Sequence, residues 1–123
     1  MTIAYWCVLV VGLLPYLWTT IAKAGTAYDN RVPRAPQENV PEWRKRALWA
    51  HYNAFEALPL FSAAVIIAQQ VGVTQGRING LALAFVGFRV AHGLVYIAGF
   101  ATLRSLVWAG GLLCVITLFV SAA

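Results

Sequence analysis

The fold depends on one segment, residues 47–71, which reads ALWAHYNAFEALPLFSAAVIIAQQV. Its uninterrupted apolar part, residues 57–68, is too short to cross a bilayer, because a helical crossing needs about 20 residues. A complete crossing therefore includes the stretch that carries His51, Asn53 and Glu56. Since a buried ionisable side chain costs about 2.5–3.5 kcal/mol on insertion scales, their presence indicates a specific role.

Three more apolar segments accompany this one, and each has the length of a membrane-spanning helix. They comprise residues 3–22, 78–99 and 103–122. Of the 123 residues, 61% are hydrophobic and 11% are charged, whereas a soluble domain usually has a charged fraction of about 25%. These values argue against a soluble fold. The sequence predicts an all-α integral membrane protein in which residues 1–123 form a single four-helix bundle.

Two of the helix starts have local signals. Asn39 and Glu42 resemble a capping box, so the second helix is expected to begin near Val40, before the apolar segment. Thr102 is a candidate N-cap for the fourth helix. Residues 25–41 are rich in proline and mixed charges and predict an extramembrane connection.

Basic residues are distributed unevenly along the chain. Seven of the nine belong to one side of the predicted bundle: Lys23, Arg31, Arg34, Arg44, Lys45, Arg46 and Arg104. Arg77 alone lies in the turn between the second and third segments. Because cytoplasmic connections are enriched in Lys and Arg, we expect residues 25–41 in the cytoplasm and both termini on the non-cytoplasmic side.

Two classes of ligand are not expected. Cys7 and Cys114 lack the spacing of a zinc or disulfide motif, so we predict no metal site and interpret both as small apolar side chains. The cluster Arg44-Lys45-Arg46 indicates contact with anionic lipids, and nothing in the sequence indicates a nucleic acid partner.

Two charged residues of the predicted spans match in depth. Glu56 lies ten residues after Arg46, and Arg89 lies ten residues before Gly99. At about 1.5 Å per residue, both are about 15 Å from the cytoplasmic side. We therefore expect Glu56 and Arg89 to meet, and a structural ion pair is the main alternative to a ligand-binding role.

Helical periodicity groups further polar residues with this pair, at about 100° per residue. On the second segment Arg46, Asn53 and Glu56 share one face, and His51 points away from it. On the third segment the shared face carries Arg89, His92 and Tyr96. The opposite face of that segment has a row of small residues that is expected to let another helix approach closely: Gly80, Ala84, Gly87, Ala91 and Ala98.

Arg104 is expected in the first turn of the fourth helix, where a cation opposes the helix dipole. An anion bound by the guanidinium and the free backbone N–H groups would remove this conflict. If that ligand were a thiol, the same charge would favour its thiolate form. Anchoring at a positively charged cytoplasmic boundary is the alternative role.

The stretch from Arg46 to Phe61, RALWAHYNAFEALPLF, resembles the signature of the MAPEG family, the membrane-associated proteins in eicosanoid and glutathione metabolism. The resemblance covers nearly the whole chain. Its specific elements are Arg46, Ala50-His51, Asn53, Glu56, Pro59, Arg89, His92, Tyr96 and Arg104-Ser105. It implies a bacterial-type member, a left-handed four-helix bundle that assembles as a homotrimer in the inner membrane.

The resemblance also implies a function, a thiol-dependent transferase or peroxidase. It assigns glutathione binding to Arg46, Asn53, Glu56, Arg89, His92 and Tyr96, and catalysis to Arg104 and Ser105. Glu56 would bind the glutathione amine, and Arg104 would hold the thiolate that attacks a lipophilic electrophile or reduces a hydroperoxide. The implied partners are glutathione, a hydrophobic small molecule, membrane lipids and further copies of the chain.

The chain departs from the family pattern at three positions. Trp49 and Tyr52 stand where many glutathione-binding members have arginines, and Trp108 stands where a tyrosine is frequent. Without those arginines, the glutathione carboxylates lose bidentate partners. The candidates to replace them are Lys23, Arg44 and Lys45. The departures favour a second interpretation, a non-catalytic scaffold, lipid-binding protein or accessory subunit of a larger membrane complex.

Overall fold

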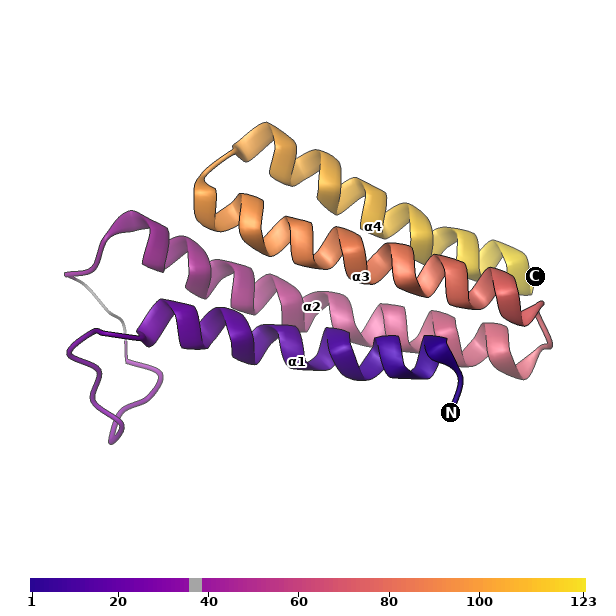
Figure 1. The fold of residues 1–123 in the computed structure, drawn as a ribbon, viewed down its shortest axis with the longest axis horizontal. Coiled ribbons are helices and arrows are strands. Elements are labelled where there is room, and N and C mark those ends of the chain that lie inside the picture. Colours follow the sequence, from indigo (N-terminus) through magenta and orange to yellow (C-terminus); the bar gives the residue numbers. More distant parts are fainter. Residues whose placement is uncertain (36–38) are drawn as a thin grey trace.

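The computed structural model describes residues 1–35 and 39–123 of the chain, and all regular structure in these ranges is helical. The four helices are α1 (Ile3–Lys23), α2 (Glu42–Gln70), α3 (Gln75–Ala98) and α4 (Ala101–Ala122). They run antiparallel to their neighbours in sequence (Figure 1). Both termini and the α2–α3 turn lie at one end, and the long connection and the α3–α4 turn lie at the other, here called the loop end. The predicted all-α fold is confirmed.

Three of the four helices, α1, α3 and α4, are long and apolar enough to cross a membrane. Helix α2 is the longest, with 29 residues, but its first turns carry Glu42, Arg44, Lys45 and Arg46. It packs against the three others. Apolar side chains cover much of the outer surface, as expected for helices that face lipid.

The helix starts differ from two sequence predictions. Helix α2 begins at Glu42 after Pro41, and no side chain caps it, so the capping box of Asn39 and Glu42 is not formed. Helix α4 begins at Ala101, which makes Thr102 its second residue and not its N-cap. The cause is Gly99, whose φ of 88° ends α3 in a left-handed conformation and turns the chain directly into α4.

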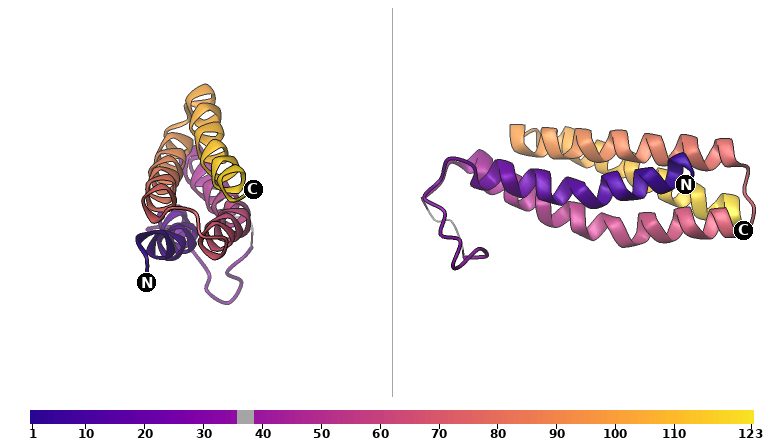
Figure 2. Two further views of the ribbon diagram at one scale, coloured as in Figure 1. Left: turned by 90° about the vertical axis from the view of Figure 1, so that its right-hand side faces the viewer. Right: turned by 60° about the horizontal axis from the view of Figure 1, so that its bottom comes forward.

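The interior consists of two apolar clusters. The larger one, toward the termini, contains the stacked rings of Phe61 and Phe85, with ring centroids 4.0 Å apart. The smaller one, toward the loop end, contains Trp18 and Ala54. Among the described residues α4 does not contact α1, and the two helices lie at opposite corners of the bundle (Figure 2). Only the second half of α4, from Gly111 onward, has buried residues.

The row of small residues on α3 does not support helix packing within the chain. A side-chain carbon added at Gly80 or Gly87 would meet nothing within 4 Å. The buried face of α3 instead carries larger residues, including Phe85 and Arg89, and the small residues are therefore turned outward. The close approach of α3 to α1 occurs at Gly93, which lies against the ring of Trp18.

Candidate functional site

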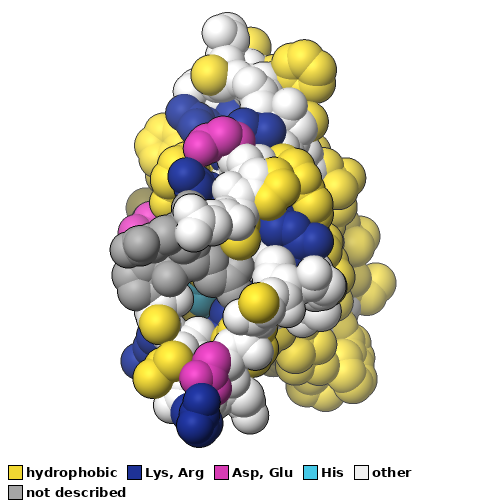
Figure 3. All heavy atoms as spheres, turned by 90° about the vertical axis from the view of Figure 1, so that its left-hand side faces the viewer, with side chains coloured by type: hydrophobic (Ala, Val, Ile, Leu, Met, Phe, Trp, Pro, Cys, Tyr) yellow, Lys and Arg dark blue, Asp and Glu magenta, His cyan; other side chains and the backbone are white. Residues whose placement is uncertain are grey.

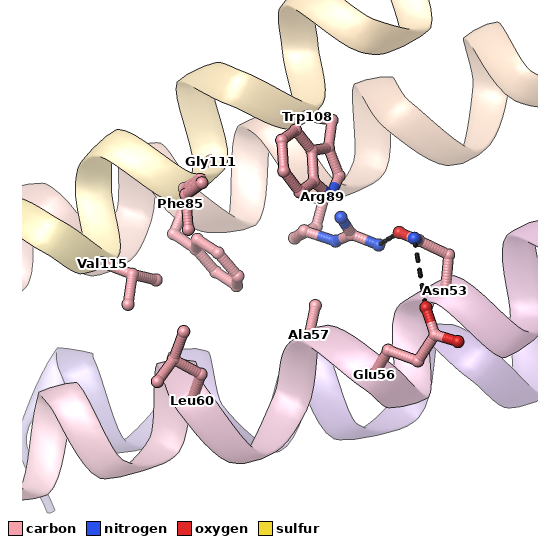
Figure 4. Close-up of a pocket in the computed structure, with 10 residues that line it drawn as sticks. Asn53, Glu56, Ala57, Leu60, Phe85, Arg89, Trp108, Gly111 and Val115 are labelled. Atoms are coloured by element: carbon pink, nitrogen blue, oxygen red, sulfur yellow. Dashed lines mark hydrogen bonds between the residues drawn. The ribbon is translucent and has the colours of Figure 1, made fainter.

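A buried arginine lies at the centre of the bundle. Arg89 of α3 is only 4% exposed, and its Nη2 donates a hydrogen bond of 2.7 Å to Oδ1 of Asn53 on α2. The amide nitrogen of Asn53 lies 3.5 Å from Oε2 of Glu56, one turn further along α2. Figure 4 shows the three side chains in a row from α3 to α2. The polar faces of α2 and α3 therefore meet in the structure, as expected from the sequence.

The predicted contact between Glu56 and Arg89 is not formed. The ion pairs among residues 1–35 and 39–123 are Arg31–Asp29 and Lys45–Glu42, both outside the bundle interior. Asn53 occupies the position next to the guanidinium, and the exposed Glu56 side chain extends away from it. The amide thus connects a buried cation to a carboxylate at the surface.

A cavity of about 210 Å³ opens beside this row, between α2, α3 and α4 (Figure 4). One wall is polar and consists of Asn53, Glu56 and Arg89. The rest of the lining is apolar or aromatic: Ala57, Leu60, Phe85, Trp108, Gly111, Leu112 and Val115. A cavity with these two walls can hold a polar group next to an apolar one.

Two buried polar atoms of the described residues have no hydrogen-bond partner, Nε of Arg89 and Nδ1 of His92. Leaving such a group unpaired costs about 1–3 kcal/mol. His92 is 2% exposed, and its ring packs edge-on against Tyr96 at 5.5 Å. It does not line the cavity, so within one chain His92 lies behind the site and not on its surface.

A second group of predicted site residues lies at the loop end. The guanidinium of Arg104 stacks over the ring of Tyr96 at 4.7 Å. Nε of Arg46 donates a hydrogen bond of 3.0 Å to the carbonyl of Ile97. These three cationic and aromatic side chains line a cavity of about 170 Å³ with the α3–α4 turn. Because no side chain caps α4, its first N–H groups can also face an anion there.

The residues that the sequence assigned to one site therefore do not all line the same cavity. Asn53, Glu56 and Arg89 line the central cavity, and Arg46, Tyr96 and Arg104 line the loop-end cavity. Ser105 is exposed, its hydroxyl donates to the carbonyl of Ala101 one turn earlier, and it lines neither cavity. His51 points away from the polar row, and its Nδ1 donates to the carbonyl of Pro15 on α1, at 2.8 Å.

The apolar side of the central cavity was not predicted from the sequence. Phe85 lies four residues before Arg89 on the same face of α3, which is the signal that could have identified it. Trp108 was noted only as a departure from a family pattern, and the structure places it on the cavity wall. Its neighbours on α4 could not be assigned, because an apolar residue in an apolar helix gives no indication of its partner.

The three cations proposed to replace missing arginines are already engaged within the chain. Nζ of Lys23 donates to the carbonyl of Pro33 at 2.7 Å, and Nζ of Lys45 pairs with Glu42 at 3.0 Å. Arg44 donates to the carbonyl of Ala22 in the last turn of α1 and to that of Ala24, the residue after the helix. Trp49 and Tyr52 are both exposed on α2.

Comparisons with known proteins give one result. A family model described as the MAPEG family matches residues 3–123, essentially the whole chain. No curated protein and no solved structure matches the chain.

Proposed function

The chain belongs to the MAPEG family, and from this membership we propose that it is a membrane enzyme that uses glutathione or a related thiol against lipophilic electrophiles or hydroperoxides. Members of the family commonly use glutathione. The proposal includes four membrane-spanning helices, a homotrimer in the inner membrane, and both termini on the non-cytoplasmic side. The protein itself is an integral membrane protein of this family.

The central cavity is the observation that carries this proposal. Its polar wall of Asn53, Glu56 and Arg89 suits a charged peptide-like ligand, and part of its apolar wall belongs to α4, a helix with many exposed apolar side chains. A thiol tripeptide can then bind at the polar wall while an apolar substrate binds beside it at the apolar wall. Burial in such a site strengthens each hydrogen bond to the ligand, because water is excluded.

The proposed residue roles follow from charge and position, and they require one extended ligand that reaches from the central cavity to the loop-end cavity. Glu56, the carboxylate on the cavity wall, binds the ligand amine, and Asn53 fixes the ligand backbone through its amide. Arg104 can leave its stacked position over Tyr96 and hold the thiolate at the uncapped start of α4. Arg46 binds a ligand carboxylate with the guanidinium nitrogens that do not contact Ile97.

The chemistry requires no group beyond the thiol and the substrate. In transfer, the thiolate sulfur forms a bond to the electrophilic carbon, and the bond from that carbon to the leaving group breaks with its electron pair. In peroxide reduction, the thiolate attacks one oxygen, the O–O bond breaks, and the alcohol leaves after taking a proton. A second thiol then displaces hydroxide from the sulfenic acid, which gives a disulfide and water. Stabilising the thiolate by a nearby cation accelerates both reactions.

Binding and turnover test the proposal together. The purified protein in lipid nanodiscs is titrated with glutathione by calorimetry and assayed with 1-chloro-2,4-dinitrobenzene and cumene hydroperoxide. We expect Arg104→Gln to lower kcat by about 10²-fold or more, by analogy with loss of one preorganised donor, and Glu56→Gln to raise KM. Arg77→Gln, at the opposite end of the bundle, is the matched control and should change neither. No glutathione binding at millimolar concentration by the folded protein would refute the proposal.

A non-catalytic scaffold is the second candidate, and the placement of three cations favours it. Because Lys23, Arg44 and Lys45 line neither the central cavity nor the loop-end cavity, they do not replace the arginines absent at Trp49 and Tyr52. A scaffold predicts that the protein copurifies with a partner subunit from its native membrane and shows no thiol turnover. Cross-linking that yields a three-chain species together with turnover would exclude this role.

A further inference from the structure

Three consecutive cations at the start of α2 do not form one surface patch. Arg44 reaches the carbonyls at the end of α1, Lys45 pairs with Glu42, and Arg46 donates to Ile97 of α3. Arg46 is therefore separated from its two neighbours. Arg44 and Lys45 instead lie together with cations from other elements.

They surround a cavity of about 100 Å³ beneath the long connection, here called the basic pocket. Its cations are Lys23 of α1, Arg34 of the connection, and Arg44 and Lys45 of α2. The described lining contains no carboxylate. Figure 3 looks onto this end of the molecule, where Lys and Arg side chains gather.

The described part of the chain leaves the positive charge in the basic pocket largely uncompensated. Lys23 and Arg44 donate to neutral backbone carbonyls, so both keep their full charge. Among the described residues, the one carboxylate partner of these cations is Glu42, which pairs with Lys45 and is mostly exposed to solvent. Like charges held close together disfavour one another, and an anion placed among them relieves this repulsion.

An aromatic surface continues from the floor of the basic pocket. His51 and Tyr52 belong to the lining, and the His51 ring packs edge-on against Phe55 at 5.0 Å. Phe55 in turn packs edge-on against Tyr16 of α1 at 5.8 Å. Tyr16, Tyr52 and Phe55 are all exposed, on the outer face of α1 and α2. This aromatic strip leads from the basic pocket toward the middle of the bundle.

We propose that the basic pocket binds the phosphate headgroup of an anionic phospholipid whose acyl chain lies along the aromatic strip. The cavity volume suits one phosphate group, and the cations supply its charge partners. The apolar strip explains why the ligand is a lipid and not free phosphate, because only a lipid gains from covering Tyr16, Tyr52 and Phe55. This site is separate from the central cavity and from the loop-end cavity, and it goes beyond the proposed enzymatic function.

Lipid binding is measured by native mass spectrometry of the delipidated full chain with added phosphatidylglycerol or phosphatidylcholine. The test variant combines Lys23→Gln with Arg34→Gln. Arg44 is left unchanged because it caps α1. We expect one tightly retained phosphatidylglycerol per chain, and about thirtyfold weaker binding by the double variant, from about 1 kcal/mol per cation removed. The neutral headgroup should show no dependence on the two cations.

Two controls make the result specific. Arg31→Gln removes a cation of the same connection that does not line the basic pocket, and Arg77→Gln removes one at the opposite end. Both should retain wild-type affinity, and an equal loss in either control would overturn the proposal in favour of nonspecific attraction. Inorganic phosphate is tested alone. If it binds as tightly as the lipid, or if Phe55→Ser leaves lipid affinity unchanged, the lipid assignment is wrong.

Discussion

At the scale of single residues, the buried guanidinium of Arg89 depends on one amide. In the sequence, Glu56 and Arg89 match in depth and in helix face, which predicted that α2 and α3 would bring polar groups together. The two helices do so in the structure. What the sequence did not predict is that Asn53 and not Glu56 would contact Arg89. The two candidates lie on the same face one turn apart, so the choice depends on side-chain reach and on the relative height of two helices, which periodicity does not specify.

Removing the amide should therefore destabilise the bundle. We expect Asn53→Ala to cost about 2 kcal/mol, because a hydrogen bond to a charged group is lost and Arg89 stays buried. Combining it with Arg89→Met should recover part of the loss, since an apolar pair leaves no unpartnered charge. Denaturation in mixed micelles, followed by circular dichroism, measures both variants, with Ser62→Ala on the same helix as the control. An unchanged midpoint for Asn53→Ala would show that Arg89 does not depend on it.

Asp29 provides a pH-dependent contact outside the bundle. Hydrogen bonds from the side chain and backbone of Arg31 hold the pKa of the Asp29 carboxyl below its ordinary value. A carboxyl whose pKa is lowered on folding contributes stability above its unfolded pKa, and that contribution is lost as pH falls through the folded pKa. We expect Arg31→Gln to raise the Asp29 titration midpoint, measured by carbon-13 NMR of labelled aspartate. Because Asp29 is an exposed residue, global stability should hardly change.

At the scale of helices, the close contact of α1 and α3 lies where sequence reasoning did not place it. Small residues occur on more than one face of α3, and the row from Gly80 to Ala98 is the more regular one, yet it faces outward. Gly93 is the position that meets Trp18. Which small residue meets a large one depends on the partner helix, and a single sequence does not specify that partner.

A methyl group at Gly93 should separate the two helices. Its carbon would lie 2.1 Å from Cζ2 of Trp18, so the ring or the helix has to move. We expect Gly93→Ala to lower stability by about 1–3 kcal/mol, as overpacking does in other cores. Gly87→Ala is the matched control, and it should be neutral or slightly stabilising, because the position is open and alanine favours a helix. In a Trp18→Leu background the cost of Gly93→Ala should shrink, and an undiminished cost would place its origin elsewhere.

The end of the bundle near the termini shows a second feature that the sequence did not reveal. The amide of Ala4, at the start of α1, donates to Oδ1 of Asn79 on α3. Gln75 donates to the same oxygen and accepts from Gln69 of α2. Three helices are thus joined by side-chain amides that, in the sequence, look like ordinary interfacial residues. Such contacts depend on tertiary placement, whereas the four helices themselves follow from hydropathy and length.

At the scale of the whole molecule, the proposed orientation of the bundle depends on whether α2 crosses the membrane. Its 29 residues at about 1.5 Å each give a length of about 44 Å, which exceeds the hydrocarbon core of about 30 Å. The charged first turns can therefore extend beyond the lipid while the remainder crosses it beside α1 and α3. The loop end then carries most of the cations, and we propose from the positive-inside rule that this end lies in the cytoplasm.

Cysteine labelling tests whether α2 crosses and in which direction. In a background in which Cys7 and Cys114 are replaced by alanine, Arg34→Cys and Gly76→Cys introduce single thiols on either side of α2, both at exposed positions. If α2 spans the membrane with the loop end inside, a membrane-impermeant maleimide labels position 76 from the non-cytoplasmic side, and it labels position 34 only after permeabilisation. Labelling of both positions from the same side would mean that α2 does not cross. If instead position 34 is labelled from the non-cytoplasmic side and position 76 only after permeabilisation, the cations at the loop end do not set the orientation. The basic pocket would then face the opposite leaflet.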